Sequence, residues 1–189
     1  MSALDTVVLV EGESDRVALH AQARRLGRDL ALEGVQVLAM GGITNTRSLA
    51  RRHGPLGAGR RLAGLYDSPD ERRLRGGLAA AGLPGAATGA LEALGFFGCS
   101  RDLEDELIRA LGVDRVAAVV AAAGETASLE RLARMPAQRD WSREAVLRRF
   151  LGSRSGRKAR YARLLVEALE PAAAPPPLAA LLAHLAPVA

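Results

Sequence analysis

The sequence predicts an α/β domain, built on a parallel sheet with helices on both faces, and after it an extension made only of helices. Short β-branched runs alternate with helical patterns over about the first hundred residues, whereas only helical spacing follows residue 102. The chain has 189 residues, 49% of them hydrophobic and only 3% aromatic. A core of ample size is therefore expected, built from Leu, Val and Ala.

Four strands are expected, because buried strands of a parallel sheet are short continuous apolar runs. They cover residues 6–10, 35–39, 61–66 and 93–99. The first run ends abruptly at Glu11, the second at a glycine pair, and the third at Asp67. Functional groups collect at such carboxyl ends of strands in an open parallel sheet.

The helices are expected from capping residues and apolar spacing. Ser14 is the expected cap of a helix over residues 15–28, Thr44 or Asn45 begins the next, and another covers 70–81. Five more helices are expected in the second half, over residues 102–111, 113–123, 128–134, 143–151 and 157–169. We therefore divide the chain into an α/β core (1–112), a helical extension (113–170) and a tail (171–189).

The tail is rich in proline and ends in a short apolar segment. Three consecutive prolines, 175–177, cannot all lie inside a helix, so they are expected to form a connector. The apolar residues 178–185 then form a short docked helix or a frayed end.

Composition narrows the class of protein. The formal charge of +5 and the pI of about 10.5 permit a polyanionic partner, but 25 of the 26 basic residues are arginines, which also fits the codon bias of a GC-rich genome. A lone cysteine, Cys99, excludes a disulfide framework and a thiolate zinc site. Without a signal sequence, a run of about 18 apolar residues or a Walker-type phosphate loop, we expect a cytoplasmic protein that neither enters a membrane nor binds ATP.

Acidic residues follow two of the expected strands and, although far apart in the sequence, would meet in space at the carboxyl ends of these strands. Glu11 and Asp15 come after the first strand, and Asp67 and Asp70 after the third. Carboxylates brought together repel one another unless a cation lies between them, and Mg²⁺ prefers oxygen ligands. The alternative is that these acids only complement helix N-termini, which suits Asp15 and Asp70 better than Glu11 and Asp67.

Four acids, namely Asp102, Glu104, Asp105 and Glu106, open the helix expected over residues 102–111. Helix-dipole complementation explains such a cluster in general, but helical phase separates its members. Glu104 shares its line with Ile108 and Leu111 and should point inward, where its charge needs a cation. Asp102 and Glu106 are expected on the polar side.

Lys158 is the only lysine of the chain. Its neighbours at helical spacing are Ala162, Leu165 and Leu169, so it is expected to face inward. A compact ammonium there would stabilise negative charge developing on a phosphate. The alternative is a side chain that snorkels at the start of a helix.

Three motifs in order resemble a Toprim domain, the catalytic fold shared by topoisomerases, primases and several nucleases. They are Val7-Val8-Leu9-Val10-Glu11-Gly12-Glu13-Ser14-Asp15, Gly41-Gly42-Ile43-Thr44-Asn45 and Gly64-Leu65-Tyr66-Asp67. Two later segments, Arg101-Asp102-Leu103-Glu104-Asp105-Glu106-Leu107 and Gly156-Arg157-Lys158, resemble the Toprim half of the overcoming lysogenization defect (OLD) nucleases. The resemblance covers about residues 6 to 169 and implies a Toprim-like parallel-sheet core.

Residue by residue, the resemblance implies roles for the acids and for the lysine. Glu11 and Asp15 would bind metal, and Asp67 would be the first acid of the family's Asp-x-Asp motif. Glu104 would complete the metal shell, and Lys158 would assist the reaction together with Glu11.

The chain departs from the family pattern at Pro69, which breaks the Asp-x-Asp motif. Asp70 or Glu71 would substitute for the second acid, and Asp102 is an additional candidate. Whether one ion or two bind is therefore open. Arg157, beside the lysine, is a candidate phosphate-binding residue.

The resemblance implies a Mg²⁺- or Mn²⁺-dependent phosphodiesterase that nicks or cuts DNA by a two-metal mechanism. OLD proteins typically carry an ABC-type ATPase ahead of the Toprim part. The second hypothesis is therefore a non-catalytic or partner-dependent module that acts with a separately encoded ABC-type ATPase, and the third is a primase-like nucleotidyl transferase. DNA or RNA as substrate and the oligomeric state stay open. Trp141 and the few other aromatic residues give no base-stacking platform, which argues against a single-strand binder of that kind.

Overall fold

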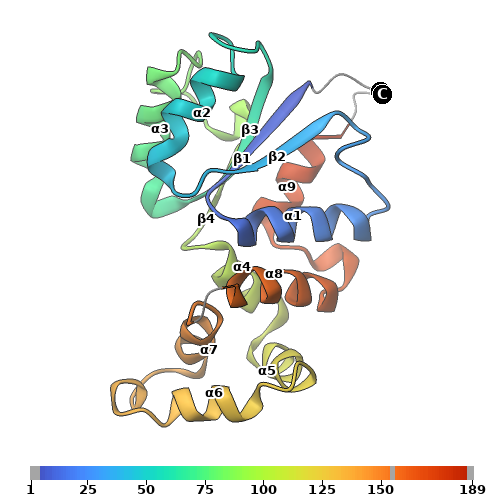
Figure 1. The fold of residues 1–189 in the computed structure, drawn as a ribbon, viewed down its shortest axis with the longest axis vertical. Helices are drawn as coiled ribbons and strands as arrows, with labels where there is room; N and C mark the ends of the chain where they lie inside the picture. Colours follow the sequence, from blue (N-terminus) through green and yellow to red (C-terminus); the bar gives the residue numbers. More distant parts are fainter. Residues whose placement is uncertain (1–4, 154–155, 187–189) are drawn as a thin grey trace.

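The computed structural model describes residues 5–153 and 156–186, and its centre is a parallel sheet (Figure 1). The strands of this sheet are β1 (Thr6–Val10), β2 (Val35–Ala39), β3 (Arg61–Asp67) and β4 (Phe96–Cys99). They lie in the order β2-β1-β3-β4, and each neighbouring pair is parallel, with Val8 opposite both Val37 and Ala63. The predicted parallel sheet is confirmed. β4 begins later than expected because residues 92–94 form a 3-10 turn that ends at Gly95, whose φ is +86°.

Helices cover both faces of the sheet, as predicted (Figure 1). On one face lies α1 (Glu13–Arg25), and on the other lie α2 (Thr46–His53) and α3 (Glu71–Ala80). Side chains of β1 alternate between the two cores, because successive residues of a strand point to opposite faces. Val8 and Val10 pack in the core with α1, whereas Val7 and Leu9 pack in the core with α2 and α3.

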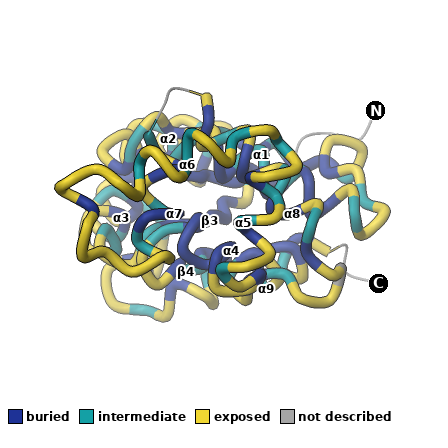
Figure 2. The backbone as a smooth tube through the Cα atoms, turned by 90° about the horizontal axis from the view of Figure 1, so that it is seen from below, coloured by how far each residue is buried: buried dark blue, intermediate teal, exposed yellow. Residues whose placement is uncertain are grey.

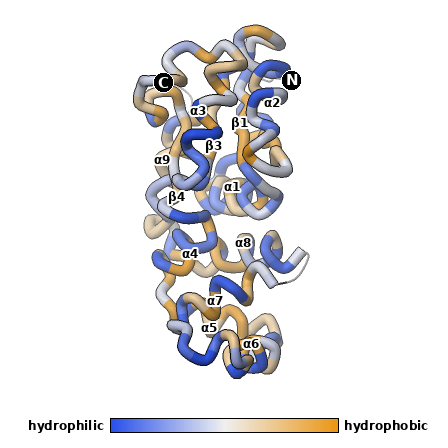
Figure 3. Tube along the Cα trace, turned by 90° about the vertical axis from the view of Figure 1, so that its left-hand side faces the viewer, coloured by the Kyte–Doolittle hydropathy of each residue, from blue (hydrophilic) through white to orange (hydrophobic). Residues whose placement is uncertain are grey.

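The second half is helical, as predicted. It consists of α4 (Leu103–Leu111), α5 (Val113–Ala122), α6 (Thr126–Ala133), α7 (Arg143–Leu151) and α8 (Arg157–Ala168). Figure 3 shows α5, α6 and α7 at the end of the molecule away from the sheet, whereas α8 returns to pack along α1 and α4. This return brings the start of α8 close to the carboxyl end of β1. Within the described part of the chain, no helix is long and apolar enough to cross a membrane.

The proline-rich tail corrects one expectation. Of the three consecutive prolines, only Pro175 precedes the last helix, α9 (Pro176–His184), whose first two residues are the other two. Proline is tolerated there because the first N–H groups of a helix have no intrahelical acceptor. α9 packs against β3, β4 and α1, and its Leu178, Leu181 and Leu182 are buried. Figure 2 shows how buried and exposed segments are distributed along the trace. The leucines of α9 are thus part of the core around the sheet.

The start of α1 corrects a second expectation. Gly12, rather than Ser14, is the N-cap residue, and Ser14 lies buried in the first turn. The side chain that meets the free backbone N–H at this end belongs to Asp15, whose Oδ2 accepts a hydrogen bond from Gly12 N at 2.8 Å. α1 therefore begins shortly after the end of β1, with Glu13 and Asp15 in its first turn.

Candidate metal and phosphate site at the strand ends

Glu11 is the first residue after β1 and is half-buried. Its Oε2 is enclosed and has no hydrogen-bond partner among the described residues. Burial raises the pKa of Glu11, and the charge of Asp70 raises it further, while Lys158 acts in the opposite direction. A carboxylate in this state lacks a counter-charge of its own.

Asp15 is buried one turn into α1. Burial, followed by the charge of Glu104, raises the pKa of Asp15 to about 6, despite the hydrogen bond from Gly12 that favours the charged form. One oxygen therefore complements the helix start, as the alternative interpretation expected. The same residue also lies within the field of the other acids.

Asp67 ends β3, the neighbour of β1 in the sheet. Burial raises the pKa of Asp67 to about 8, and the charges of Glu11 and Asp15 act in the same direction. The acids that follow two different strands are thus close enough to disfavour one another's ionised forms. Parallel neighbours end at the same edge of the sheet, and this places them together.

The acids at the ends of β1 and β3 line a cavity, and the loop after β2 forms another part of its wall. Gly41 and Gly42 have φ values of +70° and +120°, which L side chains rarely adopt. This turn lets the Gly42 N–H donate to the Glu11 carbonyl oxygen at 3.2 Å. The cavity, of about 460 Å³, is lined by these glycines together with Glu11, Asp15, Asp67 and Lys158.

Glu104 and Lys158 form an ion pair, with 2.9 Å between Oε2 and Nζ. The Glu104 side chain is only 4% exposed, as its helical phase predicted, but the Lys158 side chain is 48% exposed. The expectation that Lys158 faces the interior is therefore wrong. Burial acts to lower the pKa of Lys158, but the charge and hydrogen bond of Glu104, together with the charges of Asp15 and Asp102, outweigh it. The pKa is therefore raised, and the ammonium stays charged.

Asp102 is held by the fold on both oxygens. Oδ1 caps α4 by accepting the Asp105 N–H at 2.8 Å, and Oδ2 accepts from Arg148 Nε at 3.1 Å. Glu106 is not on the polar side as expected. It is buried and accepts the Ser100 N–H at 2.8 Å, because the turn after β4 covers this side of the helix.

Asp70 and Glu71 differ in their surroundings. Asp70 pairs with Arg73 at 2.5 Å, yet its charge still raises the pKa of Glu11, so it lies beside the strand-end acids. Glu71 instead pairs with Arg75 at 2.7 Å, on the flank of α3. Of the two candidate replacements for the missing second acid, Asp70 is the one placed near the site.

Arg157 does not face the cavity at the strand ends. Its side chain is 6% exposed, pairs with Glu125 and stacks on the Phe150 ring at 4.1 Å from the ring centroid. A guanidinium enclosed in this way supports the helical extension, so we no longer assign it to phosphate binding.

The donor set fits a hard divalent cation, because it consists of carboxylate oxygens carrying excess negative charge. Oε2 of Glu11 and Oε1 of Glu104 are buried without hydrogen-bond partners among the described residues. In the part of the chain that the structure describes, however, no three His, Cys, Asp or Glu side chains are arranged as a ready ligand group. The acids thus lie together around Lys158 without forming a finished metal cage.

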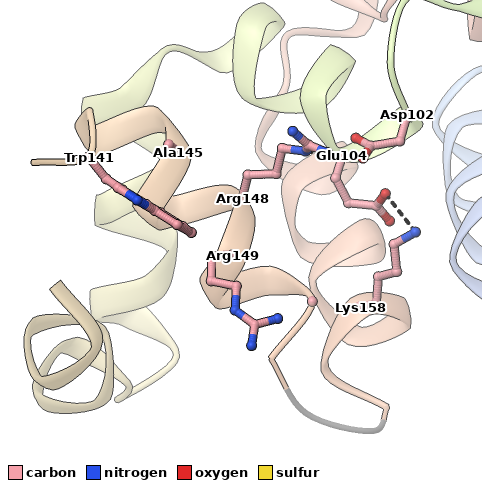
Figure 4. A pocket seen from close by; sticks show the side chains of 8 residues that line it. Asp102, Glu104, Trp141, Ala145, Arg148, Arg149 and Lys158 are labelled. Atoms are coloured by element: carbon pink, nitrogen blue, oxygen red, sulfur yellow. Dashed lines mark hydrogen bonds and ion pairs between the residues drawn. The ribbon is translucent and has the colours of Figure 1, made fainter. Parts of the chain in front are cut away.

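A second cavity, of about 500 Å³, shares Lys158 with the first and also has Glu104 in its wall. Figure 4 shows this second cavity. Its other walls include Trp141, Arg148 and Arg149, from α7 and the turn before it. Sequence reasoning missed this cavity. The arginines carry no distinctive spacing, and a lone tryptophan gives no motif.

Comparisons with known proteins agree with this arrangement. Residues 4–57 match the family described as "Overcoming lysogenization defect protein-like, TOPRIM domain", which confirms the resemblance there. The C-terminal region of the Xanthomonas campestris pv. campestris OLD protein matches with a TM-score of 0.71 and 24% identity, over 96% of this chain and 93% of that one. The C-terminal region of the Burkholderia pseudomallei OLD protein gives 0.69 and 19%, over 96% and 97%. These likenesses show the fold, and no curated protein matches.

Proposed function

From an N-terminal segment that matches the OLD-like TOPRIM family and a fold shared with OLD C-terminal regions, we propose that this chain hydrolyses phosphodiester bonds of DNA with Mg²⁺ or Mn²⁺. The observation that carries the proposal is the cluster of acids at the ends of β1 and β3. Burial and the charges of neighbouring acids raise the pKa values of Glu11, Asp15 and Asp67 there, and the ammonium of Lys158 offsets this only in part.

In this proposal the acids hold the metal. Glu11, Asp15, Asp67 and Glu104 would bind the first ion, and Asp70 would contribute to a second. Bound divalent ions supply Lewis acidity at the scissile phosphate and a hydroxide nucleophile near neutral pH. A cation would also remove the mutual repulsion that raises the pKa values of these acids.

Lys158 would act on the substrate. Its side chain is half-exposed and borders both cavities, so the ammonium can reach a phosphate oxygen that lies between them. The raised pKa keeps it positively charged throughout the physiological range. It would offset the negative charge that develops on the phosphate in the transition state.

The test is nicking of supercoiled plasmid DNA by the purified chain in Mg²⁺ or Mn²⁺. We expect relaxation that requires the ion and that Glu11→Ala or Glu104→Ala abolishes. Glu13→Ala is the matched control, because Glu13 borders the same cavity but is exposed and paired with Arg16. A wild-type chain that is inert with both ions would contradict the proposal of a self-sufficient nuclease.

A second candidate is a module that acts only with a separately encoded ABC-type ATPase. The similar solved structures favour it, because they are C-terminal regions of OLD proteins, so this fold occurs there within longer chains. In that case the chain alone would be inert, and adding the ATPase partner would restore metal-dependent cleavage.

A further inference from the structure

The second cavity, defined above by Trp141, Arg148, Arg149, Glu104 and Lys158, lies where the helical extension faces the acid site. Figure 4 shows α7 and the turn before it on one side, and the Glu104–Lys158 pair on the other. Lys158 borders both cavities, so a ligand in the second cavity is a direct neighbour of a phosphate at the first.

The cations around this cavity differ in whether the fold already uses their charge. Arg148 is bound to Asp102, and Lys158 is bound to Glu104. Arg149 is exposed and forms no ion pair or hydrogen bond with any residue that the structure describes. A guanidinium without a partner at the edge of a cavity is suited to an external anion, and its planar donors match phosphate oxygens.

Trp141 supplies the second element of a binding site. It directly precedes the cap of α7 and remains 44% exposed, although it is the largest apolar side chain in the protein. An indole ring at the wall of a cavity offers a flat surface on which a nucleobase can stack. One ring cannot follow a strand over several bases, but it is sufficient for one base.

We propose that this cavity binds a single unpaired nucleotide of the substrate strand, with the base stacked on Trp141 and a phosphate bound by Arg149. The inference rests on the proposed function, because it makes the cavity a subsite beside the scissile phosphate. The faces of a base inside a duplex are covered by its neighbours, so the substrate is single-stranded or locally unpaired at this position. The acid site alone does not impose this requirement.

The test uses intrinsic fluorescence, because Trp141 is the only tryptophan of the chain. The full chain is titrated in EDTA with a thymidine strand of about 12 nucleotides, a length within the site sizes of single-strand binding folds. We expect the fluorescence to be quenched. An abasic strand of the same length should bind, as followed by anisotropy of a labelled end, without comparable quenching, and a blunt duplex should quench much less.

Variants separate the two contacts. Trp141→Ala should weaken binding of the thymidine strand by about fivefold or more and leave binding of the abasic strand unchanged, whereas Trp141→Phe should restore part of the affinity. Arg149→Gln should weaken binding of both strands and lower the slope of log affinity against log salt by about 0.7. Arg143→Gln is the control, since Arg143 lies on the same helix, is exposed and does not line this cavity.

The inference is overturned if the strand fails to bind, if it binds without quenching, or if the abasic strand quenches as strongly. It is also overturned if Arg143→Gln and Arg149→Gln have equal effects. Plasmid nicking is measured separately. Cleavage without quenching would remove the nucleotide subsite and leave the proposed nuclease intact, whereas quenching without cleavage in Mg²⁺ or Mn²⁺ would do the reverse.

Discussion

Two groups of buried charge lie in this chain, and they are built in opposite ways. In the helical extension, Glu125 forms ion pairs with Arg157 and, at 2.8 Å, with Arg160, and it accepts a hydrogen bond from the Tyr161 hydroxyl at 3.2 Å. At the strand ends, several carboxylates share the one ammonium of Lys158, and Oε2 of Glu11 has no partner in the described chain. The first group is complete without any added ligand, whereas the second is short of positive charge.

This difference distinguishes carboxylates that stabilise the fold from carboxylates that need a bound cation to balance their charge. A buried acid paired within its own chain stabilises the fold, and its removal leaves the partner charge uncompensated. A buried acid beside other acids destabilises the fold in the absence of a ligand, and it persists because it is needed for another purpose. The predictions below test whether the two groups behave in these opposite ways.

The largest effect is expected on catalysis at the strand ends. Glu104→Gln, which keeps the size of the side chain, should lower the rate of metal-dependent nicking by about 10²- to 10³-fold, because it removes a charge from the metal site. The rates are measured in Mn²⁺ and compared with those of Glu125→Gln. The folded molecules of that variant should be as active as the wild type. Equal losses in the two variants would erase the distinction between the groups.

The next effect is on stability, where a substitution in the helical extension should have the larger effect and one at the strand ends the smaller. Glu125→Ala should lower the free energy of unfolding by about 3–5 kcal/mol, since Arg157 is left buried without its partner. Glu11→Gln should leave the stability unchanged or raise it in EDTA, because it relieves repulsion among the acids. Urea unfolding measures both, and a Glu11→Gln protein as destabilised as Glu125→Ala would show that Glu11 has a structural role.

Divalent ions should stabilise the strand-end group specifically. At an ion concentration of about 100 times the dissociation constant, binding adds about 2.7 kcal/mol to the free energy of unfolding. Thermal unfolding with and without Mn²⁺ should show this gain in the wild type and in Glu125→Gln, but not in Glu11→Ala. A Tm that rises equally in Glu11→Ala would place the ion elsewhere.

The last effect is a pH dependence of the stability in EDTA. The folded-state pKa values of Asp15 and Asp67, about 6 and about 8, lie above the unfolded value near 4. The unfolded chain therefore binds fewer protons between these limits, so the stability that these two acids contribute is fully present below about pH 4 and is lost as the pH rises through 6 and 8.

Each kcal/mol lost from the free energy of unfolding lowers the Tm by about 2–4 °C for a chain of this size. We expect the Tm to fall by at least about 2–4 °C as the pH rises. Asp67→Asn should flatten the upper part of the profile, from pH 6 to 8. A wild-type Tm that increases over the same interval would show that folding does not raise the pKa values of these acids.

Much of the fold could be predicted because its signals are local. The first three strands are continuous apolar runs, and their observed bounds agree with the expected ones to within one residue. Capping was less predictable: Gly12 rather than Ser14 begins α1. The prolines at the start of α9 were misread because a proline run was treated as a unit, although its last two members can begin a helix.

The acids of the site could be predicted from the sequence, but the residues that pair with them could not. Helical phase placed Glu104 inside, but phase describes only a residue's neighbours on its own helix. The pairing of Lys158 with Glu104 and of Arg148 with Asp102 depends on how α4, α7 and α8 meet, as does the burial of Arg157 against Glu125. Tertiary contacts between segments tens of residues apart leave no spacing that a sequence pattern could reveal.

The most direct test of the central claim, that the strand-end acids bind a divalent cation, is a crystal of this chain soaked in Mn²⁺ and measured for anomalous scattering. The account predicts manganese at the carboxyl ends of β1 and β3, with Glu11, Asp67 and Glu104 among its ligands and Lys158 displaced from Glu104. A fully soaked crystal with no manganese at these acids, and the Glu104–Lys158 pair unchanged, would contradict it.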